Sequence, residues 1–282
     1  AFGMDATPEQ VEALRNELGL NAPLWSQLLS YFGNVVTGNL GNSISLDMPV
    51  SDAIFARLGA TVELAVIALL ISVLIGLTLG IVAALRPGSL VDIAAMLFAQ
   101  LGVSMPVYWS GVLLVMFFAV QMGVLPSIGR GAPFTEAFWA LATGNPAPIL
   151  DSLSHIILPA LALGANSAAI ISRLVRATML EVLNEDYVRT AKAKGLLPPR
   201  VVISHALRNA MLPIISVIGL RFGMLLSSSI VTETIFAWPG LGQLTINAIG
   251  QRDFPLIQGI ILTFGIMYAL INLVVDVCYA VF

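Results

Sequence analysis

Charge is scarce in this chain. Only 10% of its 282 residues are Asp, Glu, Lys or Arg, whereas 58% are hydrophobic. Soluble domains carry about a quarter charged residues, so this composition, with a mean hydropathy of +0.93, indicates an integral membrane protein. The net charge of −3 is small and gives no sign of a nucleic-acid partner, so none is expected.

Cysteine and histidine are also rare. Cys278 is the single cysteine, which excludes an internal disulfide and a cysteine-based metal cluster. The two histidines, His155 and His205, are too few and too far apart to suggest a zinc site. No segment fits the phosphate-binding pattern G-x-x-x-x-G-K-[ST], so the chain is not expected to bind ATP itself. The sequence therefore predicts no metal site and no catalytic residue.

Long uncharged runs predict an all-α integral membrane protein with five transmembrane helices, because a span needs about 20 apolar residues. The second of these runs is too long for one upright helix, so we expect a tilted helix kinked at Pro106. The predicted spans are Leu64–Leu85, a long helix from Ile93 that ends near Met122, Ser152–Ser172, Asn209–Thr232 and Phe254–Val275.

The first 58 residues differ from the rest. Residues 1–58 are polar enough to lie outside the membrane, and we expect them to form an external cap region packed on its surface. Within them the apolar segment Leu24–Val36 is too short to span. Residues 59–282 form the predicted transmembrane domain.

A charged stretch, Glu181–Pro213, interrupts the apolar sequence. Good helix formers occupy Tyr187–Lys194, and Gly195 follows, where a helix can close in the left-handed conformation. Proline is tolerated in a first helical turn, so a second helix is expected to begin at Pro198. The stretch is predicted to be a hairpin of two short helices with its elbow at Gly195.

The distribution of basic residues predicts the orientation. Of the 13 Lys and Arg residues, seven lie in or beside the hairpin, which places it in the cytoplasm. Residues 1–58 and 123–152 are then outside. If the intact protein begins in the cytoplasm, one further span must precede Ala1, since five spans give an odd count. The seven are Arg173, Arg176, Arg189, Lys192, Lys194, Arg200 and Arg208.

The hairpin resembles the cytoplasmic "EAA" loop of ABC-importer permeases, in the form found in the dipeptide, oligopeptide and nickel branch. The resemblance extends over nearly the whole chain. It rests on Asp186–Gly195, His205–Pro213, Gly38–Gly41, Thr61–Leu64, Ser104–Trp109 and Ala237–Gly242. Two features depart from the pattern. Arg189 and Thr190 stand where the general motif has Glu and Ala, and Arg221 lies inside a predicted span.

The resemblance implies the fold and the partners. It implies a type I ABC importer permease fold, in a multi-pass protein of the bacterial inner (plasma) membrane surrounded by lipid, with a sixth span before the five visible ones. The chain would be a non-catalytic permease subunit that imports di- or oligopeptides or a related small solute and forms half of the translocation path. The implied partners are a second homologous permease subunit, two cytoplasmic ATPases that bind ATP and Mg, and an external solute-binding protein.

In this family the hairpin docks on the ATPase and transmits its motion. Small residues would allow close approach, and basic residues would meet acidic rims. The alternative is a solvated connector without a partner. The residues expected to couple to the ATPase are Tyr187, Arg189, Ala191, Lys192, Ala193, Lys194 and Gly195.

A second set of residues is expected along the translocation path or its gate. Ionisable groups inside spans are costly and mark pathways by default. Arg221 would attract a carboxylate of a passing peptide, or would instead pair with the sister subunit. Glu63 and Glu233 are partner or gate candidates near outer helix ends. For Pro106 and Ser228 the alternative is ordinary packing, and for Trp238 it is a plain turn. The full set is Glu63, Pro106, Arg221, Ser228, Glu233 and Trp238.

Two other classes of membrane protein remain as alternatives. A secondary transporter would use carboxylates in the middle of spans and often shows inverted repeats, and neither is visible here. An intramembrane enzyme would need a nucleophile–base pair or a metal site, and the sequence has no H-E-x-x-H motif.

Overall fold

The computed structural model describes residues 9, 12, 15–16 and 21–281, with side chains described up to residue 277. Most of the predicted cap before residue 21 lies outside this part. The described elements are helices, and one isolated antiparallel bridge joins Asn42 to Pro49. The prediction of an all-α membrane protein is confirmed.

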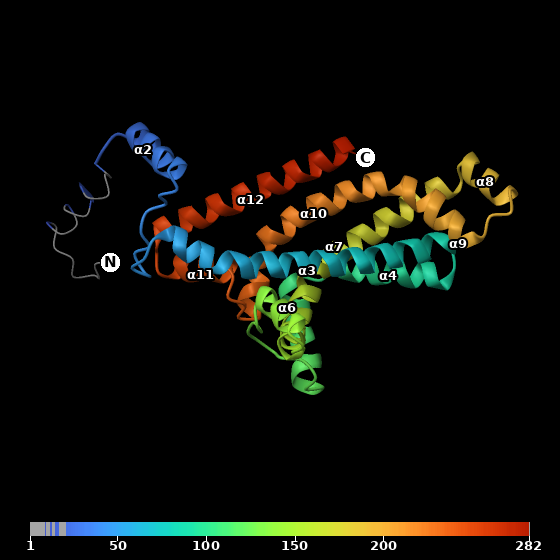
Figure 1. Cartoon of the computed structure of the whole chain (residues 1–282), viewed down its shortest axis with the longest axis horizontal. Coiled ribbons are helices and arrows are strands. Elements are labelled where there is room, and N and C mark those ends of the chain that lie inside the picture. The colour runs from blue at the N-terminus through green and yellow to red at the C-terminus, as the bar shows by residue number, and fades with distance from the viewer. Residues whose placement is uncertain (1–8, 10–11, 13–14, 17–20, 282) are drawn as a thin grey trace.

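Among the residues that the structure describes, four helices are long and apolar enough to cross a membrane. In Figure 1 they run along the length of an elongated molecule. The third consists of three consecutive elements, α9, the π-helical η2 and α10, which follow one another as one helix from residue 198 to residue 235. The elements are α3 (Val50–Leu85), α7 (Ala147–Leu183), α9 (Pro198–Arg200), η2 (Val201–Leu207), α10 (Arg208–Ile235) and α12 (Phe254–Val281).

The expected long tilted helix from Ile93 is instead a sharply bent pair. Helix α4 (Leu90–Ser104) ends before Pro106, and α5 (Val107–Leu114) continues into the π-helical η1 (Val115–Gln121). The two halves are bent by 109°, so the position of the break was predicted and its size was not. Proline excludes its predecessor from helical geometry, and Met105 accordingly has an extended ψ of 125°. The described part of the chain has up to five spans if the bent pair counts as one.

The charged hairpin forms as predicted in its first arm and differs in its second. Helix α8 (Asp186–Ala193) is followed by Gly195, whose φ of +75° is left-handed. The second arm begins at Pro198 but is not a separate short helix, because it continues directly into the span. This arm is therefore a rigid extension of a membrane helix.

Two of the remaining helices lie at the other end of the molecule, and one lies beside the long helices (Figure 1). They are α2 (Leu24–Val36), α6 (Phe134–Ala142) and α11 (Leu241–Gly250). Figure 1 shows α2 and α11 at the end away from α8, and α6 beside the row of long helices. Helix α3 runs unbroken through residues 58 and 59, so no break separates the predicted cap from the transmembrane domain.

Small residues allow α3 and α7 to pack closely. A Cβ atom on Gly80 would lie 2.6 Å from the carbonyl oxygen of Ser172, and one on Gly76 would lie 2.6 Å from the Ile171 side chain. Between membrane helices such close approach supplies packing that the hydrophobic effect does not. The pair α3 and α7 is thus the centre on which the bent pair and α10 assemble.

Candidate functional site

The hairpin presents most of the predicted coupling residues on its surface. Its exposed members are Tyr187, Arg189, Lys192, Ala193, Lys194 and Gly195. Ala191 differs, since it is only 5% exposed and packs with Val188 against Val201. Ala191 therefore holds the two arms together, whereas Ala193 lies on the surface that a partner can reach.

Basic side chains of α8 remain available to a partner. Arg189 makes a long, exposed contact of 3.5 Å with Asp186 on the same helix. Such an exposed pair contributes little to stability. Lys192 borders a groove of about 560 Å³ between the hairpin and the turn at Pro87. The charge of this helix is thus directed outward.

The turn that follows α3 is fixed by an ion pair that no local sequence signal reveals. Asp92 accepts hydrogen bonds from Nε of Arg176 at 2.6 Å and from its Nη2 at 2.7 Å. Asp92 also accepts a bond from the Gly88 amide at 2.9 Å. The partners are 84 positions apart, so only the packing of α4 on α7 brings them together. This bidentate pair ties the turn to α7 beside the hairpin.

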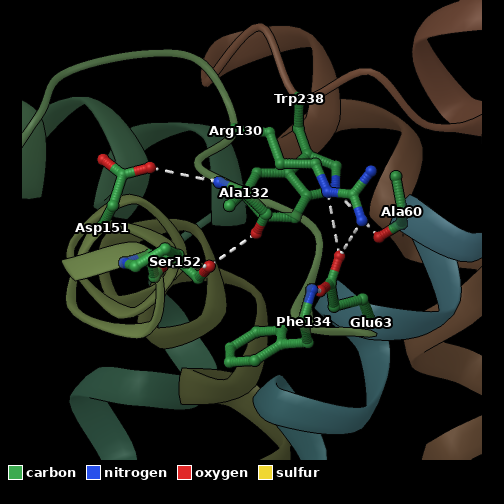
Figure 2. Close-up of polar contacts among 9 residues, drawn as sticks. Ala60, Glu63, Arg130, Ala132, Phe134, Asp151, Ser152 and Trp238 are labelled. Atoms are coloured by element: carbon green, nitrogen blue, oxygen red, sulfur yellow. Dashed lines mark hydrogen bonds and ion pairs between the residues drawn. The ribbon is translucent and has the colours of Figure 1, made fainter. Parts of the chain in front are cut away.

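At the opposite end, Glu63 organises a loop. Its Oε2 accepts hydrogen bonds from Arg130, including one of 2.9 Å from Nε, and its Oε1 accepts a 2.7 Å bond from the Phe134 amide. Arg130 also lies over the Trp238 ring, 5.8 Å from its centroid. Figure 2 shows Arg130 between Glu63 and Trp238. Glu63 therefore joins α3 to the loop before α6.

Further bonds fasten the same loop to α7. The Ser152 hydroxyl donates to the Ala132 carbonyl at 2.5 Å, and Asp151 accepts from the Ala132 amide at 3.1 Å (Figure 2). The Trp238 ring nitrogen donates to the Ala60 carbonyl of α3 at 2.8 Å. The loop of residues 130–134 and the loop containing Trp238 are held by the same two long helices.

Glu233 is fully buried and accepts four hydrogen bonds. Two come from the hydroxyls of Thr61 and Ser229, at 2.8 and 3.0 Å. The other two come from the amides of Gly242 and Gln243, at 2.7 and 3.2 Å, in the first turn of α11. A helix N-terminus favours a carboxyl group because its amides lack partners in the helix. Glu233 thus anchors α11 to α10 and α3.

The glycines of the Trp-Pro-Gly-Leu-Gly segment make room for this anchor. A Cβ atom on Gly240 would lie 2.4 Å from Oε2 of Glu233. One on Gly242 would lie 2.5 Å from the Cα atom of Ile230. Trp238 is also buried. In this conformation Glu233 and Trp238 face the protein interior, and their place is in the support of the loop rather than on a surface that a solute touches.

The remaining path candidates are exposed or half-buried. Pro106 is exposed at the bend between α4 and α5. Arg221, Met224 and Ser228 recur at positions i, i+3 and i+7 of α10, so they share one helical face. Arg221 is half-buried and contacts Sδ of Met224 at 3.6 Å. Among the described residues it has no carboxylate within ion-pair distance.

Asp253, which the sequence did not single out, fastens another loop. Its Oδ2 accepts bonds from the hydroxyls of Ser43 and Ser45, at 2.6 and 2.7 Å, and its Oδ1 accepts one from the Leu256 amide at 3.2 Å. Burial alone would raise the pKa of Asp253, but these bonds and one from the Ser45 amide outweigh it and lower the pKa from 3.8 to about 2. Asp253 and Ser43 are 210 positions apart in the sequence.

No group of three His, Cys, Asp or Glu residues that could hold a metal ion occurs within the described part of the chain. The polar clusters around Glu63, Glu233 and Asp253 hydrogen-bond to other parts of the same chain, and these bonds attach loops to helices.

Comparison with known proteins gives one consistent family. Residues 76–282 match the family model described as binding-protein-dependent transport system inner membrane component. The chain is 44% identical over 290 residues to the dipeptide transport system permease protein DppB of Escherichia coli (strain K12), covering 98% of this chain and 84% of that protein. It is 41% identical over 278 residues to the glutathione transport system permease protein GsiC of the same strain, covering 99% and 84%.

A solved structure agrees on the fold. An inward-facing conformation of the MetNI methionine ABC transporter matches with a TM-score of 0.60 over 79% of this chain and 92% of that chain. At 19% identity this likeness supports the arrangement of helices alone.

Proposed function

Because the chain belongs to the family of binding-protein-dependent transport system inner membrane components, we propose that it imports a peptide-like solute carrying a free carboxylate. Its relatives are described as permeases for dipeptides and for glutathione, and both kinds of solute have this group. Arg221 supplies a cation that has no carboxylate within ion-pair distance among the described residues, and this is the observation that carries the proposal.

The chain is a non-catalytic, multi-pass permease subunit of the inner membrane, in an ABC importer that works with ATPase and binding-protein partners. For the composition of the complex, we propose a second homologous permease and two ATPases. The hairpin then faces the cytoplasm, and the loops around Glu63 and Glu233 face outward.

The coupling step follows from the packing of the hairpin. Its second arm is continuous with α10, and α8 packs on that arm through Val188, Ala191 and Val201, so a push on α8 reaches the helix that carries Arg221. At the other end of α10, Glu233 transmits the movement to α11. Closure of the ATPases would therefore rock α10 and α11 together, which is the rigid-body form of alternating access.

Arg221 is suited to hold a carboxylate on the path. An isolated charge in an apolar medium is unfavourable, so a half-buried arginine must face water or an anion. Ser228 adds a hydroxyl on the same face of α10, two turns nearer the outer end. A solute imported along this face would meet the Ser228 hydroxyl first and would then bring its carboxylate to Arg221.

The test is Arg221→Gln in the complete complex reconstituted into liposomes with its binding protein. We expect uptake of a radiolabelled dipeptide to fall at least tenfold, while the subunits still copurify and the binding protein still stimulates ATP hydrolysis. Arg221→Lys, the matched control, should retain part of the uptake because it keeps the charge. If Arg221→Gln instead prevents assembly, Arg221 is a structural partner of the sister subunit, and the proposal is overturned.

A further inference from the structure

We propose that α2 is an interfacial anchor that lies on the outer surface of the bilayer with its apolar face in the lipid. Helix α2 lies at the end of the molecule away from the hairpin (Figure 1). The proposal rests on the proposed function, in whose orientation this end is outside.

Helix α2 has no charged residue and is strongly two-sided. Its polar residues Ser26, Ser30 and Asn34 recur at every fourth position. Leu24, Trp25 and Leu29 on the other side are 82%, 76% and 71% exposed. The complete apolar set recurs with helical spacing. It comprises Leu24, Trp25, Leu28, Leu29, Phe32 and Val36.

The face that α2 turns toward the protein is a different one. Gln27, Tyr31 and Val35 are its partly buried residues, again four positions apart. A groove of about 1110 Å³ lies between α2 and the first turns of α12, with Gln258 and Ile261 on the α12 side. Leu24, Trp25 and Phe32 of the stripe border this groove as well, yet their side chains stay exposed, so the described chain does not cover the apolar stripe.

The loop after α2 fixes the position of α2 relative to the start of α12. Leu40 packs against the cluster that contains Val50 and Leu256, at the starts of α3 and α12. Asp253 bonds Ser43 of the same loop and also the first turn of α12. Helix α2 is thus tied to the level at which α12 begins.

The apolar surface of α2 lies next to one that must meet lipid. Phe254 at the start of α12 is 66% exposed, and Ile261, which borders the groove, is 62% exposed. A span of this apolar length exposes such residues to the hydrocarbon or headgroup region. The stripe of α2 continues this surface outward, and an uncharged helix with Trp and Tyr suits the interface between lipid and water.

The absence of basic residues sets the kind of lipid contact. Many interfacial helices add attraction between Lys or Arg and anionic lipids. Helix α2 has neither, so its binding comes from apolar burial and should not depend on lipid charge. The stripe therefore binds the surface of a bilayer, whatever the charge of the lipid headgroups.

Site-directed spin labels test this in the complete complex in nanodiscs, on a background in which Cys278 is replaced by alanine. We expect a label at Leu29→Cys to be several-fold more accessible to oxygen than to a water-soluble nickel reagent. Ser30→Cys, the matched control on the opposite face, should show the reverse preference. Leu24→Cys provides a second probe of the stripe if Leu29→Cys is poorly expressed.

Two results would overturn the proposal. A stripe label reached mainly by nickel would mean that the apolar face lies in water. A stripe label reached by neither reagent would mean that protein, such as the second permease or the binding protein, covers it. Nanodiscs made of zwitterionic lipid alone should give the same accessibilities as discs containing anionic lipid, and a clear difference between them would contradict binding by apolar burial.

Discussion

The two ends of the molecule use charge in opposite ways. On α8 the cations are exposed, and the ion pair between Arg189 and Asp186 is long and open to solvent. At the other end Glu63, Glu233 and Asp253 are buried or nearly so, and each accepts several hydrogen bonds from loops or helix starts. The hairpin thus leaves its charge exposed, whereas the opposite end uses charge to fix its own loops.

This difference predicts which substitutions should destabilise the fold and which should weaken the coupling of the hairpin to the ATPase. A buried acceptor that serves several donors leaves all of them unsatisfied when it is removed. An exposed residue on α8 loses at most a solvent-exposed contact, such as the one between Arg189 and Asp186. Three measurements sharpen the comparison, in order from the largest expected loss of stability to the smallest.

The largest loss is expected for Glu233→Ala. The change removes the acceptor for Thr61, Ser229 and two amides of α11, and each unsatisfied donor carries a penalty of about 1–3 kcal/mol. We expect the free energy of unfolding to fall by roughly 3 kcal/mol or more, seen as a lower melting temperature in detergent. Glu233→Gln should recover only part of this loss, because its NH₂ group would face donors. An unchanged melting temperature in both variants would refute the role of Glu233 as an anchor.

A smaller and pH-dependent loss is expected at Asp253. Its pKa in the folded state, about 2, is below the ordinary value of 3.8. The carboxylate therefore stabilises the fold above pH 3.8 by about 2 kcal/mol, and this contribution is lost as the pH falls toward 2. The difference in melting temperature between the wild type and Asp253→Asn should be largest near pH 6 and should shrink below pH 4. A constant difference across that range would contradict the assignment.

The smallest effect on stability, with a large effect on function, is expected for Ala193→Arg. Ala193 is exposed on α8, so the longer side chain fits without disturbing the hairpin but obstructs a docked ATPase. We expect an unchanged melting temperature and at least a tenfold loss of ATP-driven uptake. The matched variant Ala191→Arg should lower the melting temperature as well, since Ala191 packs against Val201. Normal uptake by Ala193→Arg would show that this surface does not couple to an ATPase.

Sequence reasoning was most successful where the signal is local. Uncharged runs identified the spans, and the glycine after a charged helix identified the elbow, because Gly195 tolerates the left-handed backbone found there. It failed for the helix broken at Pro106, since a proline gives the place of a break and the packing around it decides the angle. It also assigned Ala191 to a surface, because periodicity alone does not say which face of a short helix packs inward.

The sequence by itself determined that this is a helical membrane protein with a charged hairpin, because hydropathy, charge and glycine or proline positions act over a few residues at a time. Only the tertiary structure decided which charges meet. Glu63 and Arg130 are 67 positions apart, and Asp253 and Ser43 are 210 apart. Such pairs exist only after the long helices have packed, since their geometry depends on the close approach of α3, α7 and α10 rather than on any neighbouring residue.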